Sequence, residues 1–217
     1  RQTRPSSLSF LRADVTEEDA PSRAVELARR LGSLGALVNN AGIGLVKPLA
    51  EVRDDELQRL LEVDFLAAFR FARAALPALI EARGAVVNIG SIQAVRPYAG
   101  YAMYSAIKAG VEGMTRGLAY DYGHLGVRAN CVHPGYVDAP QNRELISMFA
   151  PGGDVDAWVA DYAATKQCVP EIPTPRDVGE LCALLVGPHG RAITGQSFVI
   201  DGGTLAMLYE RPPTPKA

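Results

Sequence analysis

The stretch Ala85-Val86-Val87-Asn88-Ile89, followed by Gly90-Ser91, decides the fold class of this 217-residue chain. Its apolar residues do not alternate with polar ones, so the strand that it predicts must be buried on both sides. Short strand-like runs also occur at residues 36–38, 128–132 and 197–200, and helical patterns at 21–31, 54–82 and 103–122. Buried strands separated by helices predict a single α/β domain with a doubly wound parallel sheet.

The composition sets limits on function. Hydrophobic residues make up 48% and charged residues 21%, so the chain can bury a core. The net charge of -2, without a basic run, argues against a nucleic-acid or membrane-surface partner. No apolar stretch is long enough to span a membrane, and no secretory leader is recognisable. The chain has three widely spaced cysteines, and this pattern predicts neither a disulfide framework nor a metal site. We therefore expect a cytoplasmic protein.

Three side chains predict hydride-transfer chemistry. Tyr104 and Lys108 are four residues apart in a helical pattern, so they share a face. A free tyrosine has a pKa of about 10, and a neighbouring ammonium favours its phenolate. Ser91 follows a strand, at the sheet edge where such folds bind ligands. In this interpretation Ser91 orients a substrate oxygen, Tyr104 is the acid/base and Lys108 tunes Tyr104. Taken singly, these features are also compatible with a surface contact and a helix cap.

The order of five motifs resembles the short-chain dehydrogenases/reductases over residues 10–205. The motifs are Asn39-Asn40-Ala41-Gly42, Asn88-Ile89-Gly90-Ser91, Tyr104-Ser105-Ala106-Ile107-Lys108, Pro134-Gly135-Tyr136-Val137, and Ile193-Thr194-Gly195-Gln196 with Asp201-Gly202-Gly203. The resemblance implies a Rossmann-like fold, NAD or NADP as cofactor, and interconversion of a small secondary alcohol and its ketone. It also implies a homodimer or homotetramer.

The same resemblance implies which residues contact the cofactor. They are Asp14 and Val15 at the adenine, Asn40, Ala41 and Gly42 at the ribose side, Tyr104, Lys108, and Pro134, Gly135 and Val137 near the nicotinamide. An alternative for residues 39–42 is a structural turn that ties the sheet together.

The first departure from the family pattern is the lack of a Gly-rich phosphate loop before Asp14. The first strand–helix–strand unit, roughly 30 residues, would then be missing. We expect either part of a normal enzyme or a cofactor-impaired relative that acts as a binding or assembly subunit. Residues 9–13 would form a strand without its natural neighbour, and could pair beside residues 36–38.

Asp64 is the second departure, because the family usually has an asparagine here to anchor a water in the proton relay. The sequence leaves two interpretations: a buried carboxylate paired with Lys108, which draws charge from Tyr104, or a rim position open to water.

Residues 139–175 are interrupted by Pro and Gly and predict a substrate lid. Trp158 and Met148 in this segment could contact substrate or only pack. We expect residues 209–217 to be a frayed tail.

Overall fold

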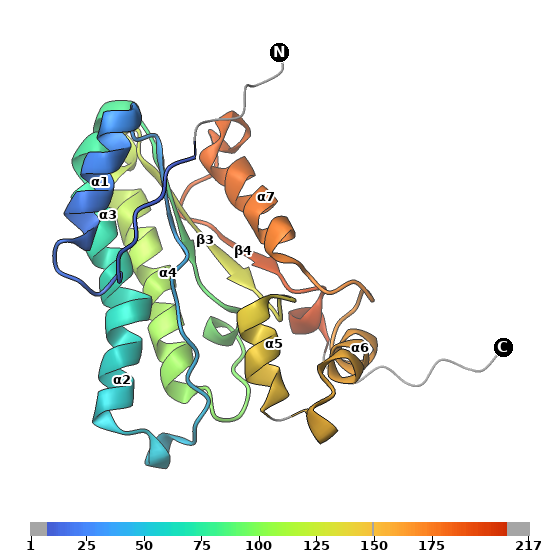
Figure 1. Cartoon of the computed structure of the whole chain (residues 1–217). Coiled ribbons are helices and arrows are strands. Elements are labelled where there is room, and N and C mark those ends of the chain that lie inside the picture. The colour runs from blue at the N-terminus through green and yellow to red at the C-terminus, as the bar shows by residue number, and fades with distance from the viewer. Residues whose placement is uncertain (1–7, 149, 208–217) are drawn as a thin grey trace.

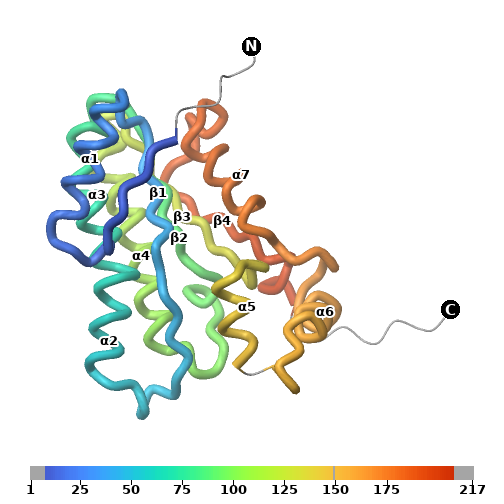
Figure 2. The backbone as a smooth tube through the Cα atoms, in the orientation of Figure 1, coloured from blue at the N-terminus to red at the C-terminus, as the bar shows by residue number. Residues whose placement is uncertain are grey.

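Four parallel strands form the centre of the computed structural model, which describes residues 8–148 and 150–207 (Figures 1 and 2). The strands are β1 (Ala36–Asn39), β2 (Ala85–Ile89), β3 (Arg128–Pro134) and β4 (Ser197–Ile200), and they pair in this order. All four carboxyl ends therefore meet at one edge, where ligands of open α/β sheets bind. The expected tail at 209–217 lies outside the described residues.

Helices cover both faces of the sheet, which confirms the doubly wound fold. They are α1 (Ala20–Leu31), α2 (Asp54–Leu61), α3 (Ala67–Ala82), α4 (Ala102–Tyr122), α5 (Pro140–Ser147), α6 (Val155–Thr165) and α7 (Pro175–Val186). Val86 packs in one apolar core with Leu79 of α3, while its neighbour Val87 packs in the other core with Leu185 of α7. Successive residues of β2 thus face opposite layers, as the unalternating sequence predicts.

The expected helix at 54–82 is helical throughout but not regular. A π-helical turn, Glu62–Leu66, joins α2 to α3 and buries Val63 and Asp64. A π turn inserts one residue into the helical repeat, so it turns the following side chains away from the regular 3.6-residue stripe. This irregularity is what brings Asp64 into the interior.

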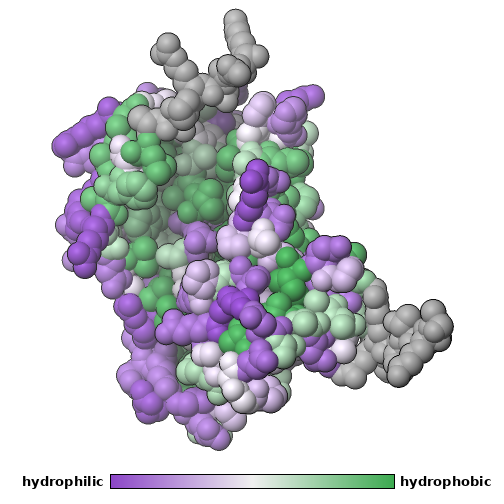
Figure 3. All heavy atoms as spheres, turned by 45° about the vertical axis from the view of Figure 1, so that its right-hand side comes forward, coloured by the Kyte–Doolittle hydropathy of each residue, from purple (hydrophilic) through white to green (hydrophobic). Residues whose placement is uncertain are grey.

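The prediction of a strand at residues 9–13 is wrong. Residues 8–14 have no strand structure, and β1 pairs with β2 alone among the described strands. Phe10 is 86% exposed and Val38 of β1 is 43% exposed. Without ladder hydrogen bonds to a neighbour, an apolar run of this length does not form a strand. Figure 3 shows apolar side chains gathered in the upper half of the face that it draws.

The expected lid at 139–175 contains two helices, α5 and α6, at the carboxyl-edge side of the molecule (Figure 1). Asp154 caps α6, since its side chain accepts the backbone N–H of Ala157 at 2.9 Å. Trp158 stacks on Tyr162 with ring centroids 5.2 Å apart, and both rings contact Tyr136. Within 8–148 and 150–207, no helix combines the length and apolarity needed to cross a membrane.

Candidate active site

Ser91 lies two residues beyond β2 and is buried. Its Oγ accepts the backbone N–H of Gln93 at 3.2 Å, so it caps the short 3₁₀ turn Ile92–Ala94. Its own backbone N–H donates to Nδ1 of His133 at 3.0 Å. The serine therefore caps this turn, which is one of the roles that the sequence allows. It is fixed at the carboxyl end of the sheet, and among the described residues its hydroxyl proton has no acceptor.

Tyr104 and Lys108 lie on the first two turns of α4. The Nζ of Lys108 is 5.6 Å from the centroid of the Tyr104 ring, and it donates to the carbonyl oxygen of Ile89 at 3.1 Å. Ile89 is the last residue of β2, two positions before Ser91. The structure therefore brings this pair to the same end of β2 as Ser91. Tyr104 is only partly buried, so its ring is not sealed from solvent.

Asp64 pairs with Lys108. Its Oδ2 is 3.0 Å from Nζ of Lys108, and its side chain is 0% exposed. Its Oδ1 accepts the backbone N–H of Ile43 at 2.8 Å, which ties the π turn to the loop after β1. The interpretation of Asp64 as a rim residue open to water is wrong, because the π turn buries it. The negative charge of Asp64 consequently offsets part of the effect that the Lys108 ammonium has on Tyr104.

The segment after β1 divides into a structural and an open part. The side-chain amide of Asn39 donates to Oδ1 of Asn88 at 2.8 Å and to the carbonyl of Ala68 at 3.3 Å. This is the sheet-tying turn of the alternative interpretation. Asn40 and Ala41 are exposed beyond it. A Cβ on Gly42 would lie 3.1 Å from Oδ2 of Asp64, so a side chain there would press on the Asp64–Lys108 pair.

The segment Pro134 to Val137 continues from β3. Gly135 donates its N–H to the carbonyl of Ile200 at 3.0 Å, and a Cβ on it would lie 2.7 Å from Cβ of Asp201. The carbonyl of Val137 accepts Nδ2 of Asn142 and the N–H of Ala139, both at 2.8 Å. Its own N–H has no acceptor among the described residues. Val137 thus presents one unused backbone donor.

Asp14 and Val15 lie in the irregular segment before α1. With Arg12, Ala13 and Glu17 they line an open hollow. Hydrogen bonds from the backbone and side chain of Thr16 hold the pKa of Asp14 below its usual range. Asp14 is therefore an ionised acceptor at neutral pH.

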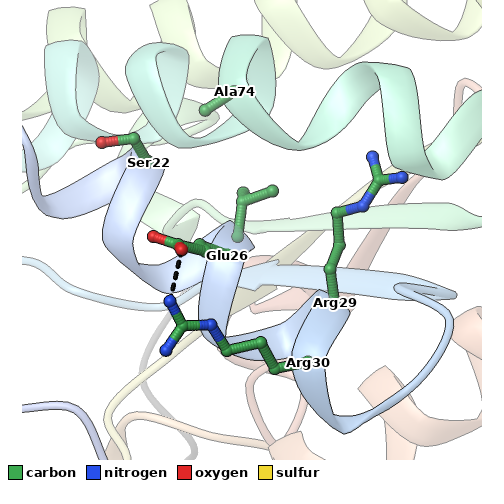
Figure 4. Close-up of a pocket in the computed structure, with 6 residues that line it drawn as sticks. Ser22, Glu26, Arg29, Arg30 and Ala74 are labelled. Carbon is green, nitrogen blue, oxygen red and sulfur yellow. Dashed lines mark hydrogen bonds and ion pairs between the residues drawn. The ribbon is translucent and has the colours of Figure 1, made fainter.

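A second hollow lies between α1 and α3 and is lined by residues such as Ser22, Glu26, Arg29 and Ala74 (Figure 4). Glu26 and Arg30 pair across its wall. None of the residues that line it belongs to the candidate site, so it adds nothing to the chemistry there.

His133 lies against Ser91, a contact that the sequence does not indicate. The three histidines, His124, His133 and His189, show no metal-ligand spacing, so the sequence alone favours a surface or core role for each. The structure places it in β3 with 0% exposure, one residue before Pro134 and in direct contact with Ser91. The sequence does contain one signal for its position: His133 directly follows the strand predicted at residues 128–132, and residues that follow parallel strands lie at the same edge of the sheet, as Ser91 does. In the described ranges, no group of three metal-ligating side chains is gathered.

Gly90 is required by the packing of His133. A Cβ at this position would lie 2.5 Å from Nδ1 of His133 and 2.9 Å from Sγ of Cys131. We expect Gly90→Ala to lower the free energy of unfolding by about 1–3 kcal/mol, the usual cost of overpacking. Urea unfolding checks this. Gly179→Ala in α7 is the matched control: its Cβ meets nothing within 4 Å, so it should stabilise the protein by about 0.5–1 kcal/mol. Equal stability of both variants would contradict the packing argument.

Comparison with known proteins agrees with this geometry. A family model described as enoyl-(acyl carrier protein) reductase matches residues 2–204. The trans-4-hydroxycyclohexanecarboxylate dehydrogenase of Sinomonas cyclohexanicum is 33% identical over 203 residues, which cover 91% of this chain and 71% of that protein. The inactive 2-(S)-hydroxypropyl-CoM dehydrogenase 2 of Xanthobacter autotrophicus is 34% identical, over 90% of this chain and 84% of that protein.

A solved structure gives the same result. The crystal structure of a blue fluorescent protein from a metagenomic library, in complex with NADPH, has 39% sequence identity and a TM-score of 0.75. The match covers 88% of this chain and 74% of that one. Because the family model spans most of the chain and relatives above 30% identity cover it, the chain belongs to the short-chain dehydrogenase/reductase family of NAD(P)-dependent oxidoreductases.

Proposed function

We propose that this protein interconverts a small secondary alcohol and its ketone, with Tyr104 as the acid/base. The observation that carries the proposal is the meeting of Ser91, Tyr104 and Lys108 at the carboxyl end of β2. Ser91 donates its hydroxyl proton to the substrate oxygen while its lone pair stays on the N–H of Gln93. Tyr104 takes the proton from the alcohol oxygen in oxidation and returns it in reduction, and the Lys108 ammonium stabilises the phenolate.

The residues present fit the nicotinamide, ribose and adenine parts of a dinucleotide, whereas the Gly-rich loop for its phosphates is lacking before Asp14. The N–H of Val137 has no acceptor among the described residues. The Lys108 ammonium donates to the carbonyl of Ile89 and pairs with Asp64, and it has a further donor to offer a hydroxyl. Asn40 is exposed, and Asp14 offers an anionic acceptor to the amino group of the adenine. When bound, the cofactor accepts a hydride from the alcohol carbon or delivers one to the ketone carbon. These side chains would hold it and keep the substrate oxygen within reach of Tyr104.

Titration of the purified protein with NADPH and NADH tests the cofactor part, followed through nicotinamide fluorescence. We expect saturable binding of at least one of the two, and turnover of a panel of secondary alcohols and ketones. Asp14→Ala should weaken binding about tenfold, because it removes one charge-assisted hydrogen bond. Arg29→Ala, in the unrelated hollow of α1, should bind as the unchanged protein does. Asp14→Ala with unaltered affinity would exclude the role of Asp14.

A second candidate function is a binding or assembly subunit with impaired catalysis. The Asp64–Lys108 ion pair favours it, since it draws on the charge that Tyr104 needs. The name of the inactive relative shows that loss of activity occurs among similar proteins. A chain that circular dichroism shows to be folded, but that binds neither NADH nor NADPH, would support this candidate over the enzyme.

A further inference from the structure

His133 is completely buried beneath Ser91. Its Nδ1 accepts the backbone N–H of Ser91, and its Nε2 lies 3.6 Å from Oε2 of Glu112. The distance to Glu112 is too long for a hydrogen bond, and Nε2 has no hydrogen-bond partner among the described residues. Gly90 leaves room for the imidazole ring, because a Cβ at this position would lie only 2.5 Å from Nδ1 of His133. His133 is therefore packed directly under the backbone that carries the Ser91 hydroxyl.

The hydrogen bond fixes the protonation state that the imidazole must have. Nδ1 can accept the Ser91 N–H only through its lone pair, so the ring proton must be on Nε2, facing Glu112. A second proton would put an N–H on Nδ1, opposite the N–H of Ser91. Two donors would then face each other, and the bond that holds Ser91 would be lost.

The surroundings favour the neutral ring. Burial lowers the pKa of His133 below its usual range, and the cations Lys108 and Arg116 of α4 act in the same direction. Glu112 of α4 opposes them, but its Oε1 is already engaged by Arg116 and by the hydroxyl of Ser197 in β4. From β3, Cys131 faces the same space as a neutral thiol, because burial raises its pKa to about 11.

We infer that His133 is a positioning residue of the active site, which holds Ser91 in place through its backbone N–H and acts only while its imidazole is neutral. This rests on the proposed role of Ser91. Glu112 completes the arrangement, because it lies one turn beyond Lys108 on α4. Helix α4 thus carries Tyr104 and Lys108 and, through Glu112, also faces His133, which holds Ser91.

Two substitutions of similar size separate this role from simple packing. His133→Asn keeps an acceptor at the δ position, and His133→Leu fills the space without one. We expect kcat of the leucine variant to be about tenfold lower, the effect of leaving one buried N–H without an acceptor. Its affinity for NADPH should be unchanged. The asparagine variant should recover most of the rate. In the unchanged protein we expect kcat to fall at a pH below the ordinary titration range of histidine, where the imidazole takes up a second proton. The asparagine variant should lack this acid limb of the pH–rate profile, because an amide does not titrate there.

The Ser91→Ala background shows whether His133 acts through Ser91. In that background the asparagine and leucine variants should have equal rates, whereas a loss that persists in the leucine variant would overturn the inference. Hydrogen exchange gives a readout that needs no turnover. The Ser91 amide should be protected in the unchanged protein and in His133→Asn, and exchange faster in His133→Leu. Absence of turnover in the unchanged protein would refute the proposed function alone, and equal exchange in both variants would refute this inference.

Discussion

Replacing Tyr104 by phenylalanine is expected to lower kcat at least about a hundredfold, the lower end of what a positioned general acid/base contributes. The substitution removes one oxygen and leaves the ring, so the contact with Lys108 at 5.6 Å and the edge contact with Tyr101 at 5.8 Å persist. The affinity for NADPH and the unfolding midpoint should therefore change little. Steady-state kinetics with saturating cofactor, beside a binding titration, make the measurement.

Tyr101→Phe is the matched control. Tyr101 is three residues earlier, contacts both Tyr104 and Tyr98 through its ring, and is half-buried. Burial raises the pKa of Tyr101, so its phenol stays protonated and cannot serve as a base near neutral pH. This variant should keep nearly the full rate. Equal rates for the Tyr104 variant and the unchanged protein would remove Tyr104 from the mechanism, whatever the substrate.

The parallel sheet was predictable because its signal is local. A strand that is buried on both faces carries apolar residues on each of them, and Ala85, Val86, Val87 and Ile89 show this without reference to the rest of the chain. The positions of Tyr104 and Lys108 were predictable for the same reason, since four residues make about one helical turn. Both predictions depend only on the repeat of the backbone.

The features that were missed depend on contacts between distant segments. Whether residues 9–13 become a strand depends on a neighbour for their N–H and carbonyl groups, which β1 does not provide. The π turn at Glu62–Leu66 is invisible in an apolar stripe that continues across it. His133 could not be assigned from spacing, because its partner Ser91 is 42 residues away and is contacted through its backbone. Backbone contacts leave no signature in residue type.

The Asp64–Lys108 pair leads to the largest expected effect on stability. Both side chains are almost fully buried, so removing one partner leaves the other as an unpaired charge inside the protein. We expect Asp64→Leu to lower the free energy of unfolding by about 3–5 kcal/mol. Asp64→Asn keeps one side-chain acceptor, for the N–H of Ile43 or for Lys108 but not for both, because these groups face different oxygens of the carboxylate. It should therefore cost less than Asp64→Leu, about 1–3 kcal/mol. Urea denaturation followed by circular dichroism measures both.

A double-mutant cycle distinguishes loss of the pair from damage to the fold. Asp64→Leu combined with Lys108→Met removes both charges, so the double variant should recover most of the stability lost in Asp64→Leu. Additive losses would show instead that the two residues act independently. The asparagine variant also reports on function: because it releases the Lys108 charge toward Tyr104, its kcat should be equal to or above that of the unchanged protein even though its stability is lower. A fall in kcat parallel to the fall in stability would mean that the carboxylate itself serves the reaction, and that Asp64 belongs to the proton path rather than competing with it.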